Sequence, residues 1–203
     1  MKIFIDINHP AHVHYFKNFI KIVTNKGHKV MVTARDRDVA VDLLTKYKIT
    51  FYNRGKGGYG RVGKLFYMIL IDIKIFIKSI KFKPDLYLSF ASPYLSHVSF
   101  LLKKPHITLT DTEHADKAHK IFTYPFANTI MTPDSFYNEL GKKHIKFKNI
   151  VESLYLDKKY FTPDKKVLDK ININNQKYVL LRFVSWDSHH DFGENGLSIN
   201  AKR

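Results

Sequence analysis

The chain has 203 residues, of which 44% are hydrophobic and 26% are charged. This composition is typical of a globular protein and excludes an intrinsically disordered one. Cysteine is absent, which excludes disulfides, thiolate zinc sites and a cysteine nucleophile.

The formal net charge of +16 is compatible with nucleic-acid binding. However, lysine supplies most of this charge, and lysine, isoleucine, asparagine, phenylalanine and tyrosine are abundant together, as in proteins encoded by AT-rich genes. This pattern favours codon bias and solubility over a nucleic-acid surface. Contact with anionic lipid or with an anionic small substrate stays open.

The amino terminus does not resemble a signal peptide. The apolar run Ile3–Ile5 is followed at once by Asp6 and Asn8, which is too short and too polar for the apolar core of a secretion signal. We therefore expect a cytoplasmic protein.

Residues 1–160 alternate short β-rich runs with amphipathic stretches. We predict strands at Lys2–Ile7, Lys29–Thr33, Ile49–Tyr52, Leu86–Phe90, His106–Leu109, Thr129–Thr132 and His144–Phe147. We predict helices from Pro10 to Lys26, around 39–44 with Asp36 or Asp38 as N-cap, at 62–82, 93–102 and 115–122, and a short one from Pro133–Asp134. Such alternation predicts an α/β fold with a Rossmann-like, doubly wound parallel sheet.

The long helix at 62–82 is rich in Leu, Ile, Phe and Tyr. Asp72, Lys74 and Lys78 interrupt the apolar run, so it is not expected to span a membrane. We expect it to cover the sheet, and the alternative is a basic amphipathic face that lies on lipid.

The segment after residue 160 is too small to form a domain. Asp157–Asp164 looks like a linker, Tyr178–Val184 is predicted to be a strand, and Ser198 would cap a helix that has only begun at residue 203. One strand and a helical turn cannot bury an apolar face. We therefore expect a complete domain at 1–160, and at 161–203 a linker and the first strand of an incomplete second domain, either in a fragment or in a truncated reading frame.

Ligands of open parallel sheets bind beyond the carboxyl ends of the strands, where the strand order reverses. This rule selects the loops 8–12, 91–94 and 111–114, which follow the first, fourth and fifth strands. No G-x-G-x-x-G follows the first strand, and no P-loop motif is present. The glycine-rich segment 54–60 follows the third predicted strand and not the first, and it is either a surface loop or a flap that closes over a ligand.

Candidate roles follow from residue types in these loops. His9 and His114 stand at strand ends, where an imidazole could move a proton or bond a sugar hydroxyl. Asp111 and Glu113 alternate, so an extended chain could not present both to one ligand. His28, His106 and His144 stand at strand entrances and are expected to be structural or exposed.

Two further expectations concern charge pairing and metals. Asp6 lies inside a strand and needs a partner, which Arg35 could supply, unless Arg35 contacts a ligand phosphate instead. His12 and His14 fall on opposite sides of a helical turn, so no metal site is expected there.

Five segments together resemble the domain-of-unknown-function family 354. These segments are 2–14, 32–36, 92–94, 111–114 and 181–186. The resemblance implies the glycosyltransferase-B architecture of two facing Rossmann-like domains, similar to UDP-N-acetylglucosamine 2-epimerases and MurG-type transferases, of which this chain would hold the first.

On this resemblance we expect an enzyme that transfers or epimerises a UDP-sugar, whose partners are a sugar nucleotide or a small glycan acceptor. No cofactor or metal is expected. The candidate catalytic residues are His9, Glu113 and His114, and the candidate substrate-binding residues are Asn8, His12, Arg35, Ser92, Tyr94 and Asp111. Without a second domain the chain alone is expected to be inactive. The alternatives are a non-catalytic basic protein that binds nucleic acid or anionic lipid, and an inert remnant of a split gene.

Overall fold

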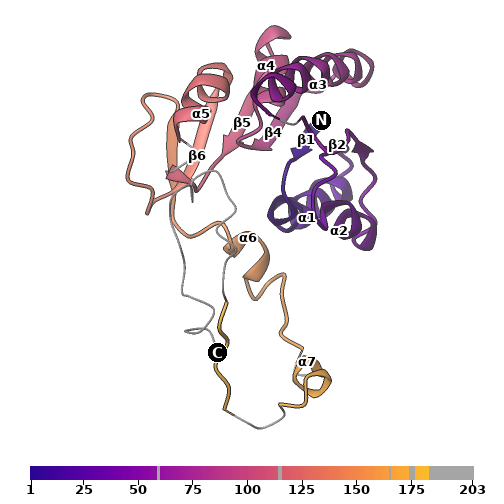
Figure 1. Ribbon diagram of the computed structural model, residues 1–203, viewed down its shortest axis with the longest axis vertical. Coiled ribbons are helices and arrows are strands. Elements are labelled where there is room, and N and C mark those ends of the chain that lie inside the picture. Colours follow the sequence, from indigo (N-terminus) through magenta and orange to yellow (C-terminus); the bar gives the residue numbers. More distant parts are fainter. Residues whose placement is uncertain (59, 114–115, 165, 174–176, 183–203) are drawn as a thin grey trace. The chain divides into compact units, whose positions relative to one another are not determined.

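The computed structural model describes residues 1–58, 60–113, 116–164, 166–173 and 177–182. The chain forms two compact units, Met1–Tyr160 and Phe161–Arg203. The sheet and the helices that cover it belong to the first unit (Figure 1).

The first unit is built on a seven-stranded sheet with the order β3-β2-β1-β4-β5-β6-β7. All six strand pairs are parallel. The strands are β1 (Lys2–Ile7), β2 (Lys29–Ala34), β3 (Tyr52–Asn53), β4 (Leu86–Phe90), β5 (His106–Leu109), β6 (Thr129–Pro133) and β7 (His144–Phe147). The predicted parallel α/β sheet is confirmed, and its order reverses between β1 and β4.

Helices cover both faces of the sheet. On one face Ile3, Ile5 and Ile7 pack in a core with α1 (Pro10–Asn25) and α2 (Ala40–Lys46). On the other face Phe4 packs with α3 (Gly60–Phe82) and α4 (Pro93–Leu101). Because side chains alternate along a strand, β1 is buried on both sides, which explains its nearly continuous apolar sequence.

The remaining helices are short. The α5 helix (Asp116–Phe122) and the 3-10 helix η2 (Tyr124–Phe126) pack together next to α4, and α6 (Ser153–Leu156) packs on α1. The second unit contains α7 (Lys166–Lys170).

Three predicted local features of the first unit are wrong. The third strand is Tyr52–Asn53 rather than Ile49–Tyr52, because only Thr33 and Ala34 of β2 pair with it. No helix begins at Pro133–Asp134, since β6 continues through Pro133 and the Asp134 amide donates to the carbonyl of Phe147 in the adjacent strand β7, 2.9 Å away.

The third error concerns the start of α2. Neither Asp36 nor Asp38 caps this helix: its N-cap is Val39, without a side-chain cap hydrogen bond. Asp38 instead has a positive φ of 49° and accepts from Arg37.

In the second unit, residues 177–182 form no strand, contrary to the prediction for Tyr178–Val184. Tyr178, Val179, Leu180 and Leu181 are between 57% and 87% exposed. A β-prone run needs a neighbouring strand to satisfy its backbone groups, and propensity alone does not supply one. Val184 and Ser198 lie outside the described residues.

Among the described residues, no helix combines the length and apolarity needed to cross a bilayer.

Candidate functional site

The loops after β1, β4 and β5 leave the same edge of the sheet, because the three strands are adjacent and parallel. Ring contacts connect the first two loops to each other. The rings of His9 and His12 are 5.9 Å apart, and Phe90, the last residue of β4, lies 4.8 Å from the His12 ring and 5.0 Å from the Tyr15 ring. The third loop lies near them: burial and then the negative charge of Asp111 raise the pKa of the Tyr15 hydroxyl.

A buried ion pair lies beneath this edge. The Asp6 carboxylate accepts two hydrogen bonds from the guanidinium of Arg54, from Nε at 3.0 Å and from Nη2 at 3.2 Å. It also accepts from the hydroxyls of Thr33 at 2.7 Å and Ser92 at 2.6 Å. Both charged side chains are almost fully buried, at 0% and 3% exposure. Bidentate pairing and full hydrogen bonding are what a buried ion pair requires.

Arg54 joins this ion pair to the helices on the second face. Its Nη1 donates to the Tyr67 hydroxyl of α3 at 3.1 Å, its Nη2 donates to the Asn8 side chain, and its guanidinium stacks 4.5 Å from the Tyr94 ring of α4. Burial lowers the pKa of Arg54, but the Asp6 carboxylate and the Tyr67 and Tyr94 hydroxyls together raise it by more, so the guanidinium stays charged. Arg54 therefore fixes the relative positions of β1, α3 and α4 at the point where the strand order reverses.

The expectation that Arg35 could neutralise Asp6 is wrong. Arg35 instead donates from Nε to the Lys56 carbonyl at 2.7 Å. A Cβ atom on Gly57 would lie 2.5 Å from the Arg35 guanidinium, so the glycine is what permits this contact. Sequence reasoning missed Arg54, because β3, the strand that it follows, is separated by β2 from the strand that carries Asp6.

Three predicted substrate-binding residues contact the Asp6–Arg54 pair. Ser92 is fully buried, and its hydroxyl is engaged by Asp6. The Tyr94 ring lies against the Arg54 guanidinium, and burial raises the pKa of its hydroxyl. Asn8 also holds Arg54, through its side-chain oxygen.

The imidazoles of His9 and His12 lie further out. His9 caps α1, and its Nδ1 accepts from the Ala11 amide at 3.2 Å. The Nδ1 of His12 accepts from the Asn8 amide at 3.4 Å. Burial lowers the pKa of both rings, for His12 to about 3, with nearby charges contributing. Since each Nδ1 is an acceptor, each neutral ring carries its proton on Nε2 and presents a donor there.

Asp111 and Glu113 line a cavity of about 200 Å³ together with residues after β6 and β7, among them Phe136 and Val151. The strand β5 ends at Leu109, so the restriction expected for an extended chain does not apply to these two residues, and both line one cavity. One oxygen of Glu113 accepts from the Tyr137 amide. His114 lies outside the described residues.

The histidines expected to be structural are indeed held by neighbours. His106 is fully buried and its Nε2 lies 2.9 Å from the Ser89 hydroxyl, and His144 Nε2 lies 2.7 Å from the Thr132 hydroxyl. His28 Nδ1 is 3.1 Å from the N-terminal amine. In the part of the chain that is described, no group of three His, Asp or Glu side chains could hold a metal.

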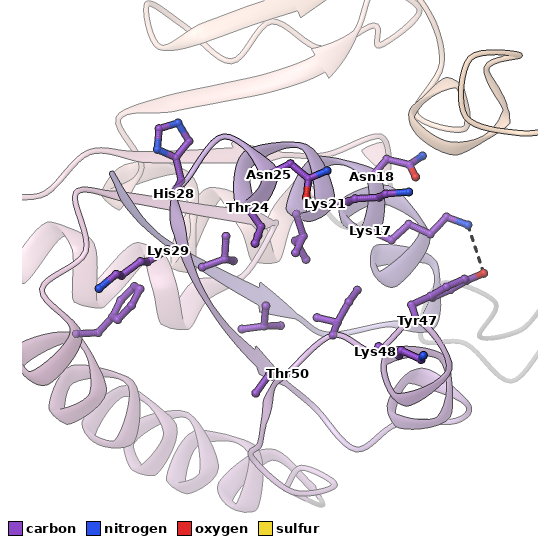
Figure 2. Close-up of a pocket in the computed structure, with 15 residues that line it drawn as sticks. Lys17, Asn18, Lys21, Thr24, Asn25, His28, Lys29, Tyr47, Lys48 and Thr50 are labelled. Atoms are coloured by element: carbon purple, nitrogen blue, oxygen red, sulfur yellow. Dashed lines mark hydrogen bonds between the residues drawn. The ribbon is translucent and has the colours of Figure 1, made fainter.

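A larger cavity, of about 930 Å³, lies elsewhere. It opens between α1, the start of β2 and the chain after α2, and Figure 2 shows Lys29 and Lys17 at opposite ends of its lining. The Lys17 amine bonds the Tyr47 hydroxyl at 3.3 Å. The cavity is lined by the apolar residues Ile20, Val30 and Val32, and its lysines do not converge on one point. The smaller polar sites at the carboxyl edge are therefore better placed to bind a ligand.

Solved structures with the same fold include UDP-GlcNAc 2-epimerases and MurG. The chain is similar to UDP-GlcNAc 2-epimerase from Neisseria meningitidis bound to UDP-GlcNAc, with a TM-score of 0.59 and 17% identity over 86% of this chain and 50% of that one. It is also similar to Acinetobacter baumannii MurG, with a TM-score of 0.53 and 14% identity over 72% of this chain and 45% of that one. At these identities the likeness shows the fold alone, which is that of one half of a glycosyltransferase-B protein.

Sequence comparison gives a relative and a family. An uncharacterized protein of Methanocaldococcus jannaschii is 29% identical over 183 residues, covering 85% of this chain and 53% of that protein. The chain thus spans about half the length of the relatives that it matches. The family model described as "Protein of unknown function (DUF354)" matches residues 1–195. The chain therefore belongs to the DUF354 family.

Proposed function

We propose that the carboxyl edge of this sheet is one wall of a sugar-nucleotide site, and that the whole protein transfers or epimerises the sugar of a UDP-sugar. The observation that carries the proposal is the convergence of the loops after β1, β4 and β5 at the strand-order reversal. The glycosyltransferase-B fold of the similar structures supports the choice of ligand class.

The outer groups of this edge match the two ends of such a ligand. The Nε2–H donors of His9 and His12 suit diphosphate or hydroxyl oxygens, and Arg35 lies in the adjacent loop after β2. The carboxylates of Asp111 and Glu113 repel phosphate but accept hydrogen bonds from sugar hydroxyls. We therefore place the diphosphate toward the histidines and the sugar toward the carboxylates.

Roles for individual residues follow from this placement. Glu113 is the proposed general base, because one of its oxygens is held by the Tyr137 amide, which orients the carboxylate. His9 is proposed to donate a hydrogen bond, because its Nδ1 already accepts one. Asn8, Ser92 and Tyr94 are proposed to position the loops through Asp6 and Arg54.

The test is a titration of the 203-residue chain with UDP-GlcNAc, UDP and GlcNAc, followed by amide chemical shifts in NMR. We expect fast exchange with a dissociation constant of about 1 mM, because one wall alone buries only part of the ligand. The shifts should move at residues 8–12, 91–95 and 111–113. His9→Ala should weaken binding of UDP, and Glu113→Gln should weaken binding of GlcNAc but not of UDP.

Lys48→Gln is the matched control, since this lysine lines the large cavity away from the carboxyl edge. The proposal is rejected if no ligand moves any shift at about 10 mM, or if the shifts cluster around the large cavity instead.

A further inference from the structure

The α3 helix has two apolar sides. One side packs on the sheet through the buried residues Ile71 and Ile75. The opposite side carries large apolar side chains that are 49% to 75% exposed, which we name the α3 stripe: Val62, Phe66, Ile69, Ile73, Ile77 and Ile80. Their spacing of three and four residues places them in one continuous row.

Such a row is unusual for the outer side of a helix in a globular domain, which is normally polar. Single exposed apolar residues need no explanation, but a contiguous group marks an interaction surface. The neighbouring helix α4, which packs beside α3 (Figure 1), also exposes large apolar side chains, Phe100 and Leu101, at 61% and 66%. The α3 stripe therefore needs a partner with its own apolar region.

The charges around the α3 stripe indicate what that partner is. The exposed ionisable side chains described on α3 include Lys74 and Lys81 on the flank of the stripe. The single acidic residue in the helix sequence, Asp72, accepts from His97 Nδ1 at 2.8 Å on the side toward α4. Two copies of a chain with a net charge of +16 would repel each other across this face, whereas an anionic surface would attract it.

We propose that the α3 stripe and its flanking lysines dock this domain on the surface of an anionic lipid bilayer, with α3 lying in the plane of the interface. An apolar face bordered by lysines is the pattern of interfacial helices, whose lysine stems extend along apolar surface while the amines reach the headgroups. The helix lies on the bilayer rather than through it, because no helix in the described part of the chain is suited to crossing one. The proposal does not depend on the sugar-nucleotide function.

The test is flotation of the full chain with vesicles of phosphatidylcholine alone and with about a third phosphatidylglycerol. We expect the chain to float with the anionic vesicles, to be released by high salt, and to leave neutral vesicles largely unbound. The variant Ile69→Gln/Ile73→Gln/Ile77→Gln should lose binding, because the α3 stripe supplies the apolar contact. Lys74→Gln/Lys81→Gln should lower partitioning about 30-fold, at about fivefold for each lysine near the surface.

Lys26→Gln/Lys46→Gln is the matched control. It removes the same charge from exposed positions on α2 and at the end of α1, on the other face of the sheet, and should bind like the wild type. Far-UV circular dichroism checks the fold of each variant, and the lysine pair decides the question if the isoleucine variant does not fold.

Two results would overturn the proposal. One is equal flotation of the Lys74→Gln/Lys81→Gln variant and its control. The other is light scattering that shows a wild-type dimer which the isoleucine substitutions convert to a monomer, because the α3 stripe would then be an interface between copies.

Discussion

At the scale of single residues, the Asp6–Arg54 pair contributes most to the geometry of the candidate site. A carboxylate inside a central strand would be strongly unfavourable alone, and here it has four hydrogen bonds from three side chains. The pair connects three parts of the chain that are far apart in sequence. Removing one partner should lower the free energy of unfolding, because the other partner then stays buried and charged.

We expect Arg54→Met to lower the free energy of unfolding by roughly 3–5 kcal/mol, the effect of breaking a buried ion pair. Asp6→Leu/Arg54→Met should recover part of that loss, since neither charge remains. Urea unfolding measures both. Arg37→Met is the control, because the Arg37–Asp38 pair is 47% and 60% exposed and should contribute less than about 1 kcal/mol. Equal losses in Arg54→Met and Arg37→Met would contradict the buried-pair account.

His106 makes stability depend on pH. Burial lowers its pKa from 6.5 to about 3, so between these values the unfolded chain binds a proton that the folded chain does not. The contribution of His106 to the free energy of unfolding is complete above about pH 6.5 and is lost as the pH falls toward 3. His106→Gln should therefore reduce the fall of unfolding free energy between pH 6.5 and 4 by up to about 1.4 kcal/mol per pH unit. Urea unfolding of the wild type and of His106→Gln at several pH values tests this prediction. If both lose the same free energy of unfolding as the pH falls, the pKa of His106 is not lowered and the prediction is wrong.

At the scale of elements, the glycine-rich segment packs against the start of α3. A Cβ atom on Gly58 would lie 2.1 Å from the Gly63 carbonyl oxygen, whereas a Cβ on Gly63 would lie no closer than 3.9 Å to the atoms around it. The close approach brings Arg54 to Tyr67 across the junction. Gly58 is therefore required by packing, and Gly63 is not.

Gly58→Ala should destabilise the protein by roughly 1–3 kcal/mol through backbone displacement. Gly63→Ala, inside the helix, should stabilise it by about 0.5–1 kcal/mol through a better helix propensity. The two variants control for each other in thermal unfolding, and a shift of the same sign in both would disprove the packing argument.

At the scale of the whole molecule, the buried side chains among the described residues all belong to the first compact unit. Among the residues described after Tyr160, no side chain is buried. Val179, Leu180 and Leu181 are 70% to 87% exposed. We therefore propose that residues 1–160 fold independently, as the sequence predicts.

A chain that ends at Tyr160 should unfold at the same temperature as the 203-residue chain, within about 2 °C. It should also aggregate less, because exposed apolar side chains are removed. Calorimetry and light scattering measure the two effects. As a control, a chain that ends before α6 should unfold at a lower temperature, because α6 packs on α1. If the chain that ends at Tyr160 unfolds at a much lower temperature, residues after Tyr160 contribute to the fold and the proposal is wrong.

The sequence by itself determined the alternation of strands and helices, the parallel sheet and the three loops at its carboxyl edge. These features depend on local apolar periodicity and on the rule that parallel strands need crossover helices, both of which can be read along the chain. It did not determine β3, because a strand of two residues depends on its neighbour β2 more than on its own propensity.

Only the tertiary structure decided which side chains meet. Arg54 rather than Arg35 pairs with Asp6, and Asp111 and Glu113 share a cavity because the chain turns after β5. The outward-facing α3 stripe also depends on how the helix is rotated against the sheet, since the helix is apolar on both sides. Contacts between residues 48 or 86 positions apart are set by packing in space, and local patterns do not encode them.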